Sequence, residues 1–198
     1  MIFLKILNDE KIVEKKFTIK KSKFITYISK VKNKEELDKF IMSHSDKSAT
    51  HNCYAYRYGD NKLTYGYNND GEPNGTAGEP LLKLIETNEL TNIVIFVTRY
   101  YGGIKLGTGG LQKAYSAMAI ESLKETTFKQ LELLYNVDIS FNISDIKTVY
   151  SFLKNIATEI TYDYIDDLVY ANLKLEQLEK LDPIKSKLEI IKKEQGYY

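Results

Sequence analysis

The stretch TRYYGGIKLGTGGLQKAY, residues 98–115, places five glycines directly after a predicted strand and directly before a predicted helix. The segment upstream, residues 92–101, is a nearly unbroken apolar run of the kind that forms a buried central strand. Downstream, Leu111, Tyr115 and Met118 follow the i, i+4, i+7 spacing of a buried helix face. The sequence therefore predicts a strand, a glycine loop and a helix in succession.

A second glycine-rich stretch, DGEPNGTAGEP at residues 70–80, also precedes a predicted helix. Glycine lets a backbone approach a ligand closely or adopt a positive φ, and the free N–H groups at a helix N-terminus can receive an anion. We therefore expect the two loops to lie side by side at helices that begin near Ala77 and Gly110, with Thr76 as a candidate N-cap. The alternative is that these glycines serve only tight turns and close helix–strand packing.

Arginine is concentrated in the same region. The chain has 26 lysines but only two arginines, Arg57 and Arg99, and both lie within or beside the glycine-rich stretches. A planar guanidinium group binds phosphate or carboxylate in two directions, whereas lysine supplies a point charge. The two arginines are therefore predicted to supply charge to an anion-binding surface. Neither loop carries the Gly-Lys-Ser/Thr of a P-loop, so the sequence shows no nucleotide-binding motif of that kind.

Other polar side chains of this region allow weaker functional interpretations. His51 and Cys53 lie two residues apart on one predicted strand face and form a candidate nucleophile pair, but a lone cysteine is more often a small buried side chain, so we predict a structural Cys53. Asp70 and Glu72 are either paired carboxylates or, as we favour, turn residues. One histidine and one cysteine are too few ligands for zinc, so no metal and no cofactor is predicted.

The composition is that of a globular protein that does not span a membrane. Its 198 residues are 43% hydrophobic and 28% charged, and no apolar run approaches the roughly 20 residues of a membrane helix. The N-terminal apolar stretch is interrupted by Lys5 and Asn8 and has no small-residue cleavage site, so no secretory signal is expected. A single cysteine agrees with a reducing compartment. We expect a cytoplasmic protein without a membrane partner.

The predicted pattern of strands and helices restarts near residue 131, which indicates two domains. Residues 1–130 are predicted to form an α+β domain that carries the glycine loops. Residues 131–198 are predicted to form a ferredoxin-like β-α-β-β-α-β domain, in which Pro183 kinks or shortens the second helix.

Charge is divided in nearly the same way. Residues 1–131 carry 20 Lys and Arg against 15 Asp and Glu, a net +5, whereas residues 132–198 carry 8 against 12, a net −4. Positive charge attracts phosphate over several ångströms in solution. Any attraction for phosphate is therefore expected in the N-terminal part, and RNA binding by the acidic C-terminal part is not favoured.

Three motifs in this order, THNCYAYRYG, DGEPNGTAGEPLL and VTRYYGGIKLGTGGLQKAY, closely resemble the signature of the IMPACT/YigZ family of small cytosolic proteins, in its bacterial-type two-domain form. The resemblance is specific over residues 16–126 and looser beyond them. It implies an N-terminal α+β domain like the second domain of a small-subunit ribosomal protein. It also implies a C-terminal ferredoxin-like domain similar to the last domain of elongation factor G.

The resemblance implies a role in translation. Eukaryotic members of the family are translational regulators that compete for an activator of a starvation-sensing kinase, which connects the family with stress response, and nucleic-acid or ribosome-related binding is suggested for bacterial members. Carried onto this sequence, the shared surface comprises the anion-binding residues Arg57, Arg99, Gly75, Thr76, Gly78, Gly102, Gly103, Gly107, Gly109 and Gly110, and the polar residues His51, Asp70, Glu72 and Tyr100.

Three functions agree with these residues. The favoured one is a non-catalytic translation regulator, or RNA- or ribosome-associated binding protein, that uses the glycine-rich surface and has no catalytic residue. The second is an enzyme that acts on a phosphorylated small molecule held between the two loops. The third is a protein-interaction adaptor whose glycine loops are purely structural.

Overall fold

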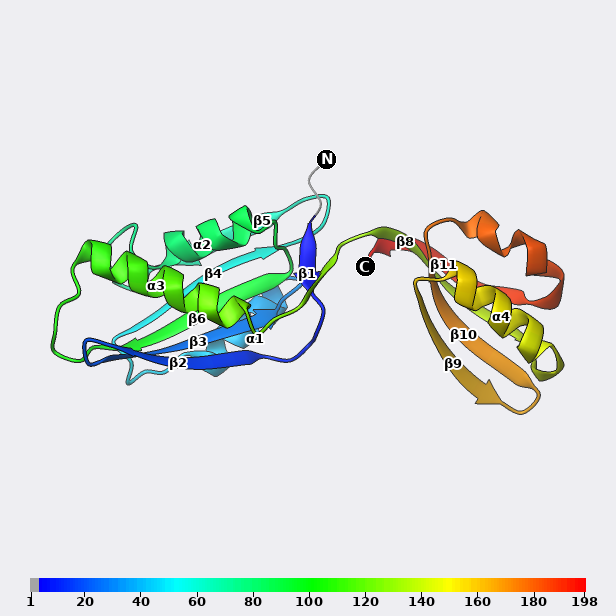
Figure 1. The fold of residues 1–198 in the computed structure, drawn as a ribbon, viewed down its shortest axis with the longest axis horizontal. Helices are drawn as coiled ribbons and strands as arrows, with labels where there is room; N and C mark the ends of the chain where they lie inside the picture. Colours follow the sequence, from blue (N-terminus) through cyan, green and yellow to red (C-terminus); the bar gives the residue numbers. More distant parts are fainter. Residues whose placement is uncertain (1–3) are drawn as a thin grey trace. The chain divides into compact units, whose positions relative to one another are not determined.

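The structure is a computed structural model and describes residues 4–198. Residues 1–3, at the start of the N-terminal apolar stretch, lie outside the described part. The chain has a mixed α/β fold of two compact units, Met1–Leu131 and Glu132–Tyr198. Each unit has its own sheet and its own helices (Figure 1).

The N-terminal unit is built on a five-stranded antiparallel sheet with the predicted apolar strand at its centre. The strand order is β2-β3-β6-β4-β5, and seven of the eight residues of β6 are buried, as in a strand covered on both faces. The strands of this sheet are β2 (Val13–Ile19), β3 (Ser22–Lys30), β4 (His51–Tyr58), β5 (Thr64–Asn68) and β6 (Ile93–Tyr100). A separate two-stranded ribbon consists of β1 (Lys5–Leu7) and β7 (Phe128–Gln130).

Both faces of this sheet carry helices, because alternate side chains of a strand point to opposite faces. Ile95 and Val97 of β6 pack in one core with residues of α2 and α3, which cover the same face in Figure 1. Val94 and Phe96 pack in a second core with residues of α1. The helices are α1 (Lys34–His44), α2 (Gly78–Thr87) and α3 (Thr108–Leu123).

Strand register brings both glycine loops to one end of the sheet. His51, at the start of β4, pairs with Arg99, near the end of β6. Because β5 runs antiparallel to β4, it ends where β4 begins. Lys23 at the start of β3 pairs with Tyr100, so the turn between β2 and β3 lies at the same end. The loops that follow β5 and β6 therefore meet there.

The C-terminal unit is a four-stranded antiparallel sheet of order β11-β8-β10-β9. Its elements follow the expected β-α-β-β-α-β order, except that the second helix is a 3-10 segment. Pro183 lies inside that segment and has no N–H group for an α-helical hydrogen bond. The elements are β8 (Leu133–Asn142), η1 (Ile143–Asp145), α4 (Ile146–Ile156), β9 (Glu159–Ile165), β10 (Leu168–Leu175), η2 (Leu178–Lys187) and β11 (Glu189–Tyr197). None of the helices within residues 4–198 is long and apolar enough to cross a membrane.

We expect the two units to unfold separately, because their cores share no residue. Leu81 is fully buried in the core of the N-terminal unit and Leu153 in the core of the C-terminal unit. Leu81→Ala and Leu153→Ala should each lower the free energy of unfolding of their own unit by about 2–5 kcal/mol. Denaturant titration followed by amide NMR signals of each unit measures this. A shift of both transitions in either variant would contradict the expectation.

Candidate functional site

The two glycine loops frame a pocket of about 400 Å³ at the end of the N-terminal sheet. This volume falls within the range of small-molecule binding sites. The first loop contributes Gly71, Glu72 and Pro73 to the lining. The second loop and the start of α3 contribute Tyr101, Lys105, Leu106, Gly107, Thr108 and Leu111. The adjacent strand ends contribute Thr50, His51 and Arg99.

Arg99, Glu72 and Tyr115 form a buried hydrogen-bonded cluster at this pocket. Arg99 Nη1 donates to Glu72 Oε1 at 2.5 Å, and the Tyr115 hydroxyl donates to the same oxygen at 2.9 Å. Arg99 and Glu72 are each 5% exposed and Tyr115 is fully buried. Burial raises the pKa of Tyr115, so its hydroxyl stays protonated and remains a donor. The cluster joins the first glycine loop to β6 and α3.

The structure gives Arg99 a different role from the expected one of supplying charge to an anion-binding surface. Its charge is neutralised by Glu72, and one arm of its fork is already bonded to that carboxylate. The guanidinium carbon also lies 5.5 Å from the ring centroid of Phe24 and 5.6 Å from that of Tyr101. Arg99 therefore positions Glu72 and the Tyr101 ring, and supplies little net positive charge to a ligand.

His51 lies at the pocket wall beside Glu72. Its Nδ1 lies 2.7 Å from the carbonyl oxygen of Asp70, and because a carbonyl oxygen only accepts, Nδ1 must carry the hydrogen. In the neutral ring Nε2 is then an acceptor, and it lies 3.9 Å from Glu72 Oε2. The His51 side chain is 18% exposed and belongs to the pocket wall. The structure thus brings together His51 and Glu72, two of the four predicted polar residues.

Asp70 is a turn residue and does not form a carboxylate pair with Glu72. Its side chain accepts a hydrogen bond from the Asn52 N–H at 2.6 Å. The Glu72 N–H donates to the Asn69 carbonyl at 2.9 Å, as in a tight turn. The favoured turn interpretation therefore describes the backbone of DGEP, but the sequence gives no sign that the Glu72 side chain is buried against Arg99.

The N-terminus of α2 is closed by groups of the protein. The Gly78 N–H donates to Asn69 Oδ1 at 2.8 Å. The prediction that Thr76 caps this helix is wrong, because Ala77 is the N-cap residue and the Thr76 hydroxyl donates to the Pro73 carbonyl at 2.7 Å. A side chain that is bonded within its own loop cannot also cap the helix. The first glycine loop therefore offers no open helix N-terminus.

The N-terminus of α3 is open. Its N-cap is Gly107, at φ +75° and ψ 165°, and no side chain makes a capping hydrogen bond. The first N–H groups of a helix have no partner within the helix, and those of Thr108, Gly109 and Gly110 meet no acceptor elsewhere in residues 4–198. The second glycine loop alone therefore presents free N–H groups of the kind expected from the sequence.

Several predicted site residues lie away from the pocket. Arg57 pairs in register with Ile93, at the opposite end of β4 from His51. The Tyr100 hydroxyl donates to Asp46 Oδ2 at 2.5 Å, and this bond raises the pKa of Tyr100 to about 12. Apart from the first turn of α3, the predicted residues that do not line the pocket are Arg57, Asp70, Gly75, Thr76, Gly78, Tyr100, Gly102 and Gly103.

Cys53 is unsuited to nucleophilic chemistry. It is fully buried, and its thiol donates to the Asn69 carbonyl at 2.9 Å and lies 3.5 Å from the Tyr115 hydroxyl. Burial raises the pKa of the Cys53 thiol to about 12, so almost no thiolate exists near neutral pH. Within residues 4–198, no group of three or more His, Cys, Asp or Glu side chains is arranged to hold a metal ion.

Tyr115 is the functional residue that the sequence pattern identifies least clearly. Its spacing on α3 indicates only a core position, whereas its hydroxyl is a donor to Glu72. A tyrosine on an otherwise apolar helix face requires a buried hydrogen-bond partner, and this requirement is the one signal that points to a polar cluster. Tyr101, Lys105 and Leu106 also line the pocket without a motif that sets them apart from ordinary loop residues.

A comparison with protein families identifies this region. The Impact N-terminal domain matches residues 20–123, a range that includes the pocket and all of its lining residues. This chain belongs to the IMPACT family. The resemblance seen in the three glycine-rich and strand motifs is thereby confirmed.

Several bacterial IMPACT proteins are similar to this chain. It is 41% identical over 123 residues to the IMPACT family member YvyE of Bacillus subtilis, 42% over 115 residues to YigZ of Escherichia coli, and 35% over 159 residues to an IMPACT family member of Thermus thermophilus. These matches cover 61%, 55% and 79% of this chain. They span 57% and 55% of the length of the first two proteins and 86% of the third.

The two-unit fold also occurs in a solved structure. A crystal structure of a protein described as hypothetical has a TM-score of 0.62 and 29% sequence identity to this chain, and the match covers 96% of this chain and 97% of that one. Both units therefore belong to the matched fold.

Gly102 is required for packing, which a substitution can show. A Cβ atom at this position would lie 2.1 Å from the backbone carbon and oxygen of Lys21, so the turn between β2 and β3 would have to move. We expect Gly102→Ala to lower the free energy of unfolding by roughly 1–3 kcal/mol. The matched control is Gly109→Ala, where no heavy atom lies within 4 Å of the added Cβ. Equal thermal stability of the two variants would show that the close approach at Gly102 is unimportant.

Alkylation measures whether the Cys53 thiol is accessible and reactive in the folded protein. Because burial both shields the thiol and raises its pKa, iodoacetamide should label the folded protein near neutral pH far more slowly than the denatured protein. Mass spectrometry of the intact chain follows the reaction. Labelling of the folded protein as fast as that of a free thiol would restore Cys53 as a candidate nucleophile.

Proposed function

We propose that this IMPACT protein is a non-catalytic, translation-related binding protein that holds RNA, free or on the ribosome, at the glycine-loop pocket of its N-terminal unit. The observation that carries the proposal is the open N-terminus of α3 at the pocket. Open helix N–H groups and the positive end of the helix dipole suit a phosphate group. Membership of the IMPACT family supports the link with translation.

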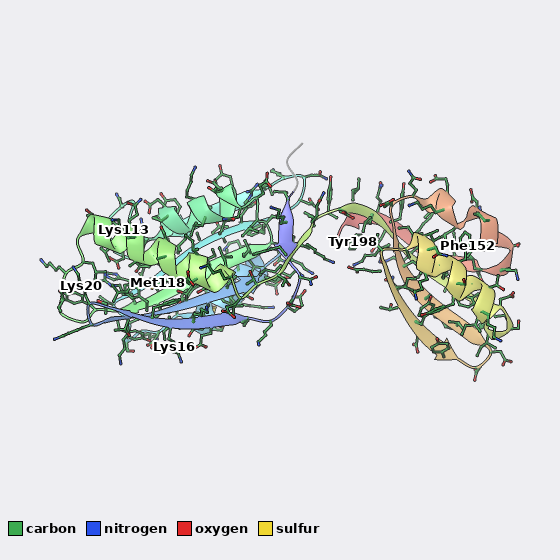
Figure 2. All side chains as sticks on the ribbon, in the orientation of Figure 1. Lys16, Lys20, Lys113, Met118, Phe152 and Tyr198 are labelled. Carbon is green, nitrogen blue, oxygen red and sulfur yellow. The ribbon has the colours of Figure 1, made fainter. Side chains whose placement is uncertain are left out.

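Unpaired lysines at the same end of the unit support binding of a phosphate chain. Five lysines there are exposed, and within residues 4–198 none of these five forms an ion pair. Figure 2 shows Lys20 and Lys113 at the end of the N-terminal unit where α3 begins. Such charges attract and retain a polyanion. The residues are Lys20 and Lys21 in the turn between β2 and β3, Lys23 in β3, Lys105 in the second glycine loop and Lys113 on α3.

Positive charge in this site comes from lysine rather than arginine. Arg99 is neutralised by Glu72, and Arg57 lies at the far end of β4. A surface of lysine point charges around open amide groups binds phosphates without reading their arrangement as strictly as an arginine fork does. The proposed surface is therefore the second glycine loop with the nearby lysines, and the first glycine loop contributes one wall of the pocket.

The structural analogies implied by the resemblance belong to this proposal as well. We propose that the N-terminal unit is related to the second domain of a small-subunit ribosomal protein and that the C-terminal unit is a ferredoxin-like domain related to the last domain of elongation factor G. The antiparallel sheet order β11-β8-β10-β9 supports the second relation. A cytoplasmic location and a role in stress response follow from the same proposal.

A pocket of about 400 Å³ also suits a small phosphorylated molecule. An enzyme acting on such a molecule is the second candidate function, favoured by the Nε2 atom of His51 at the pocket wall. Turnover of a phosphorylated compound would identify it. A binding protein shows saturable binding of RNA without turnover.

RNA binding across a salt series tests the proposal. Fluorescence anisotropy with a short single-stranded RNA should show an affinity that falls with salt, with a log–log slope of about −0.7 for each phosphate contacted. The double variant Lys105→Ala/Lys113→Ala should bind more weakly and with a shallower slope. Lys62→Ala is the matched control, because Lys62 is exposed and lies between β4 and β5, at the opposite end of the sheet.

Two results would contradict the proposal. One is the absence of salt-dependent RNA binding by the parent protein. The other is a loss of affinity in Lys62→Ala as large as that in the double variant, because binding would then follow overall charge and not the surface at α3.

A further inference from the structure

The pocket has a hydrogen-bond acceptor pair on the wall formed by the first glycine loop and the start of β4. Glu72 uses Oε1 for both of its hydrogen bonds, from Arg99 and Tyr115. Its other oxygen, Oε2, receives no hydrogen bond from any group in residues 4–198. His51 Nε2 lies 3.9 Å from Oε2, and in the neutral ring, whose Nδ1 donates to the Asp70 carbonyl, this nitrogen is also an acceptor.

Such a pair can accept hydrogen bonds from one ligand group. Glu72 lines the pocket and its side chain is 2% exposed, so Oε2 can accept a hydrogen bond from a ligand there. The 3.9 Å separation lets one amino nitrogen lie at roughly 2.9 Å from both acceptors, a normal hydrogen-bond length. An amino group carries two hydrogens and can therefore satisfy Oε2 and Nε2 together.

The balanced charge of Glu72 and Arg99 favours a neutral amino group over an ammonium ion as the donor. Arg99 already balances the carboxylate charge of Glu72, so an additional ammonium ion would lose its hydration without meeting a net negative charge. An exocyclic amino group of a nucleobase is uncharged and donates two hydrogens. It meets the requirement of the acceptor pair at a lower desolvation cost than an amine of a lysine or a polyamine does.

The other walls suit the remaining parts of a nucleotide. Pro73, Leu106 and Leu111 give the pocket apolar surface, and the ring of Tyr101 is held beside Arg99. Apolar and aromatic surfaces of this kind stack on base faces. The N–H groups at the start of α3 are placed for a phosphate.

We infer that this pocket takes one nucleotide of single-stranded RNA and selects a base with an exocyclic amino group, such as cytosine or adenine. The amino group donates to Glu72 Oε2 and His51 Nε2, and the phosphate lies at the N-terminus of α3. Uracil and hypoxanthine present a carbonyl oxygen where cytosine and adenine present the amino group, and that oxygen faces two acceptors. This inference rests on the proposed RNA-binding function and adds base selection to it.

Matched nucleotides test the inference without altering the protein. CMP is compared with UMP, and AMP with IMP, by titration into the full chain with amide NMR signals as the readout. Each pair has nearly the same shape and charge. We expect UMP and IMP to bind about tenfold more weakly or worse than their partners, as for loss of a hydrogen bond to a buried acceptor, and all bound nucleotides to shift the amides of Thr108, Gly109 and Gly110.

A protein variant supplies the second arm. His51→Phe keeps a planar ring but removes the acceptor, so the difference between CMP and UMP should shrink while the phosphate-dependent shifts at α3 remain. The matched control is His44→Phe, because His44 is the other histidine of the chain and lies on α1, against the opposite face of the sheet. The control should retain the full difference between the two nucleotides.

The outcomes separate this inference from the function on which it rests. Equal affinity for CMP and UMP, and for AMP and IMP, in the parent protein would overturn base selection and leave phosphate binding in place. An unchanged preference in His51→Phe would overturn the assigned acceptor pair. If neither single nucleotides nor single-stranded RNA bind, the proposed function is overturned and base selection with it.

Discussion

The buried ion pair of Glu72 and Arg99 fixes the geometry of the glycine-loop pocket. Removing two charges from water is costly, so such a pair is stable only where hydrogen bonds hold it in good geometry. Here the partners come from the loop after β5 and from the end of β6, and Tyr115 of α3 donates to the same carboxylate oxygen. Three elements are thereby joined at one point. Neither the first loop nor α3 can shift without leaving a buried charge or hydroxyl unsatisfied.

The same pair decides which atoms of the pocket the proposed ligand would meet. Because Arg99 and Tyr115 share Oε1 of Glu72, the second oxygen is left beside His51. Because the arginine charge is balanced internally, the proposed attraction for an anion depends on Lys105 and on the start of α3. The pocket therefore has acceptors on one wall and donors on another, and this polarity suits a ligand with a neutral donor at one end and a phosphate at the other.

Local patterns predict the elements of this site better than its contacts. The apolar run of β6 and the helical spacing in α3 indicate burial directly, so both elements could be predicted. Arg57 and Arg99 are indistinguishable in the sequence, because only the register of β4 against β6 places them at opposite ends of the sheet. Glu72 lies in a segment whose composition predicts a turn, and the turn forms. The direction of its side chain depends on Arg99, which is far away in the sequence.

The open N-terminus of α3 is a consequence of the backbone path that leads into it. Asn33 caps α1 by accepting from the Glu36 N–H at 2.9 Å, and Asn69 closes α2. A side-chain cap of this kind stabilises a helix by about 0.5–2 kcal/mol, so its absence from α3 requires a reason. Gly107 has φ +75° and ψ 165°, a conformation that only glycine adopts readily. The backbone turn that connects the second glycine loop to α3 therefore excludes a capping side chain at residue 107 and leaves the first N–H groups of the helix open to a ligand.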